Sequence, residues 1–217
     1  KGVSSAASDV YKRKLYGCWN TPNPRKVKIV LAEKAIPYEM VELNLQEGEH
    51  KTHEFLLKNP LGRVPVLETD DGEFISEAIA IWRYLEKLYP EPNLFGADAD
   101  DVGLIEMRHS QIESDFWFQV RSSWKHSPAV AKMGNKVAPD AKILSDKNVY
   151  GYYERLDDDL AGKDYLVASR FTIADIIFLV GLDFAIHYCK LKPSESLENL
   201  WSWHRFITSR KSVDAIT

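Results

Sequence analysis

The segment from Cys18 to Pro22 is the first place where residue types and their spacing suggest chemistry. An apolar run ends at Gly17, and the turn-forming residues Asn20 to Pro24 follow it, so we expect a strand here to lead directly into a helix. Backbone N–H groups at a helix N-terminus stabilise an anion, and a thiolate is such an anion. Thr21 adds a hydroxyl, which either caps the helix or donates a hydrogen bond to a thiolate.

Three further segments have residue types suited to a peptide ligand. A cis Val64-Pro65 bond would expose the Val64 backbone at a sheet edge, where an extended peptide can pair, although an ordinary edge proline is the alternative. The N–H of Ala78, expected at a helix start, is suited to binding a carboxylate. His50 and Lys51 form a cationic pair on a loop, suited to a second carboxylate. These segments together favour a site for a short peptide with two carboxylates and a thiol.

The first half of the chain alternates between strand and helix patterns. Asp71-Gly72 lies between two apolar runs and is a strong hairpin signal. The predicted order is β-α-β-α-β-β-α, with a right-handed crossover between the first two strands. Strands are predicted at 14–17, 38–45, 64–67 and 73–75, and helices at 25–34, within 48–58 and at 77–88.

The second half has helical patterns only. Thr172 and Asp175 have the spacing of a capping box, and the apolar residues after them predict a buried, structural helix. An α/β half followed by an all-α half indicates two domains. Helices are predicted at 102–125, 141–162, 172–188 and 196–210. The predicted organisation is a flexible tail at 1–11, an α/β domain at 12–89, a linker at 90–100 and an all-helical domain at 101–217.

Composition narrows the functional classes. The chain has 217 residues with 28 basic and 32 acidic side chains, which gives no reason to expect a nucleic-acid partner. No run of 18 apolar residues occurs, so no membrane span is expected, and the polar start does not have the pattern of a signal peptide. Cys18 and Cys189 are far apart in the sequence, so we expect neither a disulfide scaffold nor a metal site, and we expect a cytoplasmic location.

Nearly the whole chain resembles the cytosolic glutathione transferases, and its nearest likeness is to the bacterial and fungal group related to a yeast cytosolic transferase, with some phi-class features. Glutathione is a short peptide with two carboxylates and a thiol. The resemblance implies an N-terminal thioredoxin-like domain followed by a helical bundle. The stretches that carry it are Leu15-Tyr16-Gly17 through Arg25-Lys26-Val27, Gly48-Glu49-His50-Lys51, Asn59-Pro60-Leu61-Gly62-Arg63-Val64-Pro65-Val66-Leu67, Asp71-Gly72 through Tyr84-Leu85, and Phe171-Thr172-Ile173-Ala174-Asp175.

The resemblance also implies roles for single residues. Thr21 falls at the position of the thiol-activating serine, and Ala78 replaces the serine that usually follows the glutamate, so one hydroxyl contact is lost. A water held by His126 and Ser127 is an alternative activating group. The residues implied to bind glutathione are His50, Lys51, Arg63, Val64, Pro65, Glu77 and Ala78.

Aromatic residues suggest a place for a second substrate. These side chains either line an apolar site for an electrophile or pack in the core and at a dimer contact. The residues concerned are Phe116, Trp117 and Trp124, with Trp19 opposite them and Asn20 beside Trp19. Cys18 lies three residues before the activating position, so we interpret it as a strand-end residue rather than a nucleophile.

The resemblance implies that the chain adds the glutathione thiolate to a mostly apolar electrophile, transferring alkyl or aryl groups in detoxification or small-molecule metabolism. Glutathione would be a co-substrate, no metal would be needed, and the chain would form a homodimer. A glutathione-dependent thiol transferase or peroxidase, and a non-catalytic glutathione-binding module, remain alternatives on the same fold.

Overall fold

The computed structural model describes residues 13–19 and 21–214, which form two compact units. The division falls between Pro92 and Asn93. The predicted tail at 1–11 and Asn20 lie outside the described residues. We describe each unit by itself.

The first unit is built on a four-stranded mixed sheet with the strand order β2-β1-β3-β4. β1 (Lys14–Gly17) pairs in parallel with β2 (Glu39–Glu42), and antiparallel with β3 (Val66–Glu68). β4 (Phe74–Ser76) completes the hairpin with β3. The β-α-β-α-β-β-α order predicted from the sequence is therefore confirmed.

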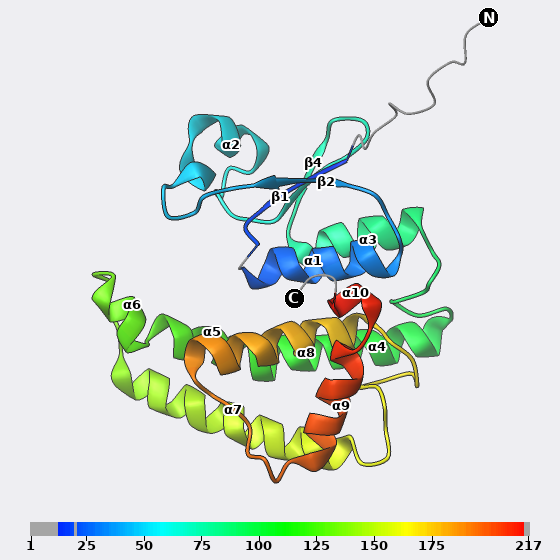
Figure 1. Ribbon diagram of the computed structural model, residues 1–217, viewed down its shortest axis with the longest axis vertical. Coiled ribbons are helices and arrows are strands. Elements are labelled where there is room, and N and C mark those ends of the chain that lie inside the picture. Colours follow the sequence, from blue (N-terminus) through cyan, green and yellow to red (C-terminus); the bar gives the residue numbers. More distant parts are fainter. Residues whose placement is uncertain (1–12, 20, 215–217) are drawn as a thin grey trace, which may run out of the picture. The chain divides into compact units, whose positions relative to one another are not determined.

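Helices cover both faces of this sheet (Figure 1). α1 (Pro22–Glu33) and α3 (Ala78–Leu88) pack side by side on one face. The 3₁₀ turn at Glu49–Lys51 and α2 (His53–Lys58) lie on the other, where Phe55 packs edge-on against Tyr16 of β1 at 6.3 Å between ring centroids. Burial of the apolar residues between these layers stabilises the sheet, and the layers hold the start of α1 and the residues before β3 in place.

The second unit is helical. The predicted helix 102–125 consists of α4 (Ala99–Gln111), a π-helical segment (Ile112–Trp117) and α5 (Phe118–Lys125) in unbroken succession. The predicted helix 141–162 is α7 (Pro139–Asp159). The predicted helix 172–188 is α8 (Ile173–Phe184) followed by a second π-helical segment (Ala185–Cys189). The predicted helix 196–210 is α9 (Glu198–Thr208).

Two short helices were not predicted, namely α6 (Pro128–Lys132) and α10 (Lys211–Asp214). The Ser127-Pro128 pair was a usable signal for α6, because Ser127 caps this helix by accepting a hydrogen bond from the Val130 N–H at 3.3 Å. The prediction missed α6 because a five-residue helix has too few apolar positions to show a period.

The predicted capping box at the start of α8 is present, and the helix after it is buried from Ile173 to Leu182. One oxygen of the Asp175 carboxylate accepts hydrogen bonds from the N–H and the hydroxyl of Thr172, at 3.0 and 3.3 Å. The other accepts from the Leu166 N–H at 3.0 Å and the Trp203 indole at 3.1 Å. Complete burial raises the pKa of Asp175 to about 6, and the four donors oppose that effect.

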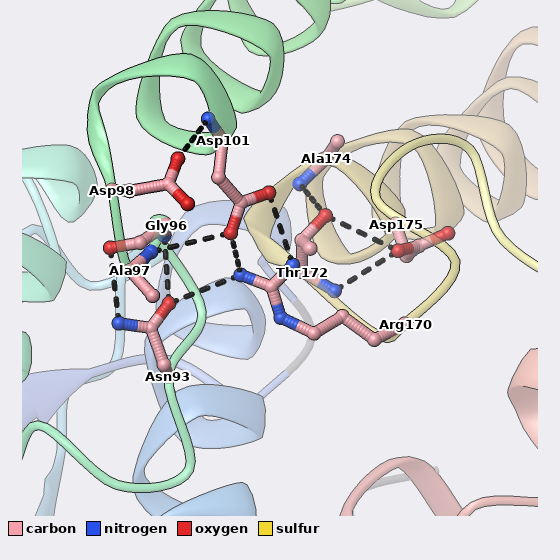
Figure 2. Close-up of polar contacts among 9 residues, drawn as sticks. All are labelled: Asn93, Gly96, Ala97, Asp98, Asp101, Arg170, Thr172, Ala174 and Asp175. Carbon is pink, nitrogen blue, oxygen red and sulfur yellow. Dashed lines mark hydrogen bonds and ion pairs between the residues drawn. The ribbon is translucent and has the colours of Figure 1, made fainter.

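Figure 2 shows a second set of polar contacts, around Arg170, next to this capping box. Arg170 binds both carboxylate oxygens of Asp101 on α4, at 2.6 and 3.2 Å, and also donates to the side chain of Asn93 at 3.2 Å. Asn93 in turn accepts from the Gly96 N–H at 2.7 Å. These contacts join the segment before α4, α4 itself and the start of α8 into one polar network.

Candidate functional site

The turn between β1 and α1 is closed by the carbonyl oxygen of Cys18. This oxygen accepts hydrogen bonds from the Thr21 N–H at 3.2 Å and from the Thr21 hydroxyl at 2.8 Å. Thr21 occupies the N-cap position, but its side chain accepts no capping hydrogen bond from α1. A threonine cap normally accepts from the second or third N–H of the helix, and the third residue here is Pro24, which has none.

Two prolines also limit the donors that α1 offers to an anion. Pro22 and Pro24 lack an N–H, and the N–H of Arg25 already bonds to the Thr21 carbonyl at 3.3 Å. Asn23 therefore supplies the one free N–H in the first turn, and no acceptor faces it among the described residues. Sequence reasoning missed this donor, although the alternating prolines around Asn23 were a sufficient signal for it.

The Val64-Pro65 peptide bond is cis, as expected. Val64 lies just before β3 and is partly buried against the cluster of Tyr16, Phe55 and Val66. The backbone N–H and C=O of Val64 form no hydrogen bond within the described residues. An extended peptide pairs, as a β-strand does, with a residue whose backbone N–H and C=O are accessible and unpaired. Val64 meets this condition, so an extended peptide can pair with it.

The turn before Val64 is fixed by the buried Asn59, a residue for which the sequence alone suggests no role. Its side-chain amide donates to the Arg63 carbonyl at 2.8 Å, and its side-chain oxygen accepts from the Leu61 N–H at 3.1 Å. Gly62 takes a φ of +56°, and a Cβ there would lie 2.7 Å from the His50 carbonyl. Glycine is therefore required at this turn for both conformation and space.

The structure gives Lys51 a positioning role at the same turn. Its ammonium donates to the carbonyls of Leu61 and Gly62, at 3.1 and 2.9 Å. Because a lysine has three N–H donors, one remains for a ligand carboxylate. His50 precedes it, and its buried Nδ1 has no hydrogen-bond partner among the described residues. The neighbouring Arg63 is exposed.

The start of α3 is strained. Glu77 has φ +69° and ψ 121°, a conformation that is uncommon for a residue other than glycine. The Glu77 carbonyl accepts from the Ile81 N–H at 3.0 Å and so begins the helix. The N–H groups of Ala78 and its successors are then the unpaired donors of the first turn, which suits a carboxylate. The exposed carboxylate of Glu77 suits an ammonium group.

His126 and Ser127 follow α5 in the helical unit. His126 accepts a hydrogen bond from the Ala138 N–H at Nδ1, 3.1 Å away, so its Nε2 carries the proton when the ring is neutral. The Ser127 oxygen accepts the capping bond of α6, and its hydroxyl hydrogen remains available as a donor. Both side chains thus keep one donor hydrogen.

Two of the aromatic residues proposed for the second substrate are core residues of the helical unit. Phe116 is completely buried and packs on Tyr152 and Phe178, with ring centroids 5.1 and 4.9 Å apart. Trp117 is 2% exposed, and its indole donates to the Ile177 carbonyl at 2.9 Å. This packing favours the structural alternative for both residues.

Trp124 has a different environment. It is partly buried and meets Phe184 and Tyr188 edge-on, at 5.8 and 5.9 Å between centroids. Phe184 and Tyr188 stack on each other at 4.9 Å, and Tyr188 is 44% exposed. Sequence reasoning missed this pair, because the apolar pattern of 172–188 predicts a buried, structural helix. Trp19, in the first unit, is half-exposed, while Asn20 lies outside the described residues.

The described ranges 13–19 and 21–214 contain no group of three or more His, Cys, Asp or Glu side chains that could hold a metal ion. None of the helices within these ranges is long and apolar enough to cross a membrane.

Comparison with known proteins identifies the family. The family described as "Glutathione S-transferase, N-terminal domain" matches residues 12–87, and "Glutathione S-transferase, C-terminal domain" matches residues 118–211. Glutathione S-transferase 2 of Saccharomyces cerevisiae is 36% identical over 199 residues, which are 88% of this chain and 84% of the yeast protein.

Solved structures agree with the sequence comparison. The crystal structure of Gtt2 from Saccharomyces cerevisiae has a TM-score of 0.85 at 32% identity, over 94% of this chain and 100% of that one. A glutathione S-transferase domain-containing protein of Marinobacter aquaeolei VT8 has a TM-score of 0.82 at 32% identity, over 92% and 99%. The first unit is thus thioredoxin-like and the second is the helical domain that follows it, and the chain belongs to the glutathione S-transferase family of enzymes.

Proposed function

We propose that this enzyme binds reduced glutathione, stabilises its thiolate at the start of α1 and adds it to an electrophilic carbon of a mostly apolar second substrate. The observation that carries the proposal is the unpaired Val64 backbone beside cis-Pro65, on a turn held by Asn59 and Lys51. The cysteinyl part of glutathione would pair with Val64 as a short β-strand.

The two ends of the tripeptide have separate anchors in this proposal. The glycine carboxylate would bind to His50 and to the remaining N–H of Lys51, with Arg63 beside them. The γ-glutamyl end carries a carboxylate and an ammonium, which would bind to the Ala78 N–H and the Glu77 carboxylate respectively. The loss of a serine hydroxyl at Ala78 leaves this backbone N–H intact. Holding both ends fixes the sulfur between them and lowers the entropic cost of the reaction.

Thr21 is our first candidate for thiolate stabilisation. The Cys18 carbonyl has a second donor in the Thr21 N–H, so it stays hydrogen-bonded if the hydroxyl rotates toward a bound sulfur. The hydrogen bond given up contributes only about 1 kcal/mol, whereas one to a charged sulfur contributes about 1.5–3 kcal/mol. The Asn23 N–H would be a second donor.

A water held by His126 and Ser127 is the alternative activating group, because each of these side chains keeps a donor hydrogen. Replacing His126 with Ala and Ser127 with Ala separates the two possibilities. If water activates the thiol, these variants lower turnover and Thr21→Val does not.

The second substrate would contact Trp124, with Phe184 and Tyr188 beside it. Turnover of a chromogenic aryl halide with glutathione tests the transferase reaction. Reduction of a mixed disulfide at a comparable rate, without aryl transfer, would instead favour a thiol transferase. Failure to bind immobilised glutathione would favour a non-catalytic module.

The chain is also proposed to form a homodimer. α4 exposes Val102, Leu104 and Met107, at 38%, 49% and 49%. Apolar side chains on one helix are a usual component of a subunit interface. Sedimentation equilibrium of the wild type and of Met107→Glu tests this, and a monomeric wild type would contradict it.

We further propose a cytoplasmic enzyme of detoxification or small-molecule metabolism, in keeping with two free thiols.

A further inference from the structure

One end of the helical unit exposes both apolar and basic side chains. The end of α5, the whole of α6 and the first turns of α7 meet there (Figure 1), and we call residues 125–147 the α5–α7 corner. Two hydrogen bonds hold its parts together. The Ser145 hydroxyl donates to the Ser122 hydroxyl at 2.8 Å, and the Ala138 N–H donates to His126 at 3.1 Å. The corner is thus tied to α5 from two places.

Three large apolar side chains of this corner face solvent. Met133, at the end of α6, is 69% exposed, and Ile143 and Leu144, in the second turn of α7, are 68% and 61% exposed. Single exposed apolar residues are common on protein surfaces, but these three lie within twelve consecutive residues. Contact with an apolar phase would remove them from water, which is favourable.

The same corner is basic, although the chain as a whole is acidic. Residues 125–147 include five lysines and two aspartates, a net charge of +3, whereas the net charge of the whole chain is −4. Lys142 pairs with Asp146 at 2.5 Å, and Asp140 is exposed. The other four lysines are exposed and form no ion pair with a described residue, namely Lys125, Lys132, Lys136 and Lys147.

The lysines and the apolar side chains alternate over one surface. Ile143 and Lys147 are four residues apart and so share a face of α7, while Ser145 and Val149 are buried on another face. A bilayer with anionic heads matches this pattern, because it has negative charge above an apolar layer. A nucleic acid matches it less well, since no aromatic side chain on which a base could stack occurs from residue 132 to 147.

We propose that the α5–α7 corner docks the enzyme reversibly on the surface of a membrane that contains anionic phospholipid. The lysine ammonium groups would lie at the charged lipid heads, and Met133, Ile143 and Leu144 would enter the boundary between the heads and the acyl chains. This is a surface contact and not a membrane span. None of these side chains is among those proposed to bind glutathione or to form the homodimer.

Docking would have a consequence for the reaction. Apolar electrophiles dissolve preferentially in lipid, so an enzyme at the membrane surface would meet them where they are concentrated. This consequence rests on the proposed function, whereas the docking itself does not.

Cosedimentation of the full chain with lipid vesicles tests the docking. Vesicles of phosphatidylcholine alone are compared with vesicles of an equimolar mixture of phosphatidylcholine and phosphatidylserine. We expect strong binding to the mixed vesicles, weak binding to the neutral ones, and a fall in binding as the salt concentration rises, because salt screens the charges. Equal binding to both kinds of vesicle, or binding to neither, would overturn the proposal.

The role of the charges is tested with single lysine variants. Lys132→Gln, Lys136→Gln and Lys147→Gln should each lower the partition coefficient for the mixed vesicles about fivefold, the effect of one lysine near an anionic surface. Lys87→Gln on α3 is the control, since Lys87 is also exposed and forms no ion pair with a described residue. Unchanged partition in the three corner variants, or an equal fall in the control, would contradict the proposal.

The role of the apolar side chains is tested separately. Met133→Ser and Ile143→Ser should each lower the same partition coefficient at least about fivefold, because less apolar surface is buried in the lipid. Both positions are exposed, so circular dichroism should show an unchanged fold. Leu57→Ser on α2 is the control, because Leu57 is 71% exposed but lies outside the corner. Binding that is as strong in the two corner variants as in this control would contradict insertion into lipid.

Two further measurements separate docking from its alternatives. Binding to heparin or polyuridylate as tight as to the mixed vesicles, with no loss in the serine variants, would replace the membrane with a soluble polyanion and overturn the proposal. Aryl transfer without vesicles should be equal in the lysine variants and the wild type. Vesicle binding by a protein that does not bind glutathione supports docking and contradicts the transferase, and transfer without vesicle binding does the reverse.

Discussion

The hydroxyl of Thr21 donates its only hydrogen to the Cys18 carbonyl, 2.8 Å away, and the Thr21 N–H donates to the same oxygen at 3.2 Å. The hydroxyl is therefore held in place, but without it the Cys18 carbonyl would still accept the hydrogen bond from the Thr21 N–H. A bound thiolate would offer it a stronger acceptor. In the proposed mechanism, the residue that closes this turn in the free enzyme would also serve the reaction.

Thr21→Val tests this double role, because valine keeps the branched shape and removes the hydroxyl. We expect kcat/KM for an aryl halide to fall roughly 10- to 100-fold, since a hydrogen bond to a charged group contributes about 1.5–3 kcal/mol. Thr21→Ser is the matched control and should retain most of the activity. Equal activity of the valine and wild-type enzymes would transfer the role to His126 and Ser127.

Replacing a proline at the start of α1 should strengthen the stabilisation of the thiolate, whereas Thr21→Val should weaken it. Pro22→Ala adds one free N–H to the first turn, where Asn23 has the one N–H that lacks a partner among the described residues. The pKa of bound glutathione should fall by about 0.2–0.7, because a charge at a helix N-terminus gains about 0.3–1 kcal/mol. Ultraviolet absorbance of the thiolate measures this. Pro139→Ala, at the first position of α7, should leave the glutathione pKa unchanged.

The turn before Val64 can be tested through its glycine. Gly62→Ala would place a Cβ 2.7 Å from both the His50 carbonyl and the Lys51 ammonium. Displacing these two groups should raise the glutathione Kd at least about tenfold, measured by calorimetry. Gly72→Ala is the control, since Gly72 also has a positive φ, at +83°, but no atom lies within 4 Å of its added Cβ. Equal losses in the two variants would remove the proposed role of this turn.

The capping box of α8 predicts a stability effect. Asp175→Asn leaves two of the four donors facing an amide NH₂ in a fully buried position, which should lower the free energy of unfolding by about 2–5 kcal/mol. Urea denaturation measures the difference. Asp164→Asn, an exposed position in the preceding loop, should change stability by less than about 0.5 kcal/mol. A tolerated Asp175→Asn would mean that the network is not needed for folding.

Local sequence patterns were sufficient for the strand and helix order. The Asp71-Gly72 turn and the Thr172–Asp175 capping box each depend on residues a few positions apart, and both are present. The π-helical segments at 112–117 and 185–189 were not predictable in this way. Gly181 shows why: a Cβ there would lie 2.8 Å from Phe116, so the path of one helix depends on the packing of another.

Residue types were enough to name Val64, Lys51 and Ala78 as candidate site residues, because backbone groups and charges at strand ends and helix starts follow general rules. Their roles stay predictions. Whether Phe116 and Trp117 lie in the core depends on contacts with α7 and α8, far away in sequence, and a sequence pattern does not determine it.

The most direct test of the account is the titration of glutathione bound to the wild-type enzyme, followed by ultraviolet absorbance of the thiolate. A sulfur held by Thr21 and by the Asn23 N–H should ionise at a pH at least about one unit below that of the free tripeptide. If bound glutathione ionises at the same pH as free glutathione, the start of α1 does not stabilise the thiolate, and the proposed mechanism is wrong.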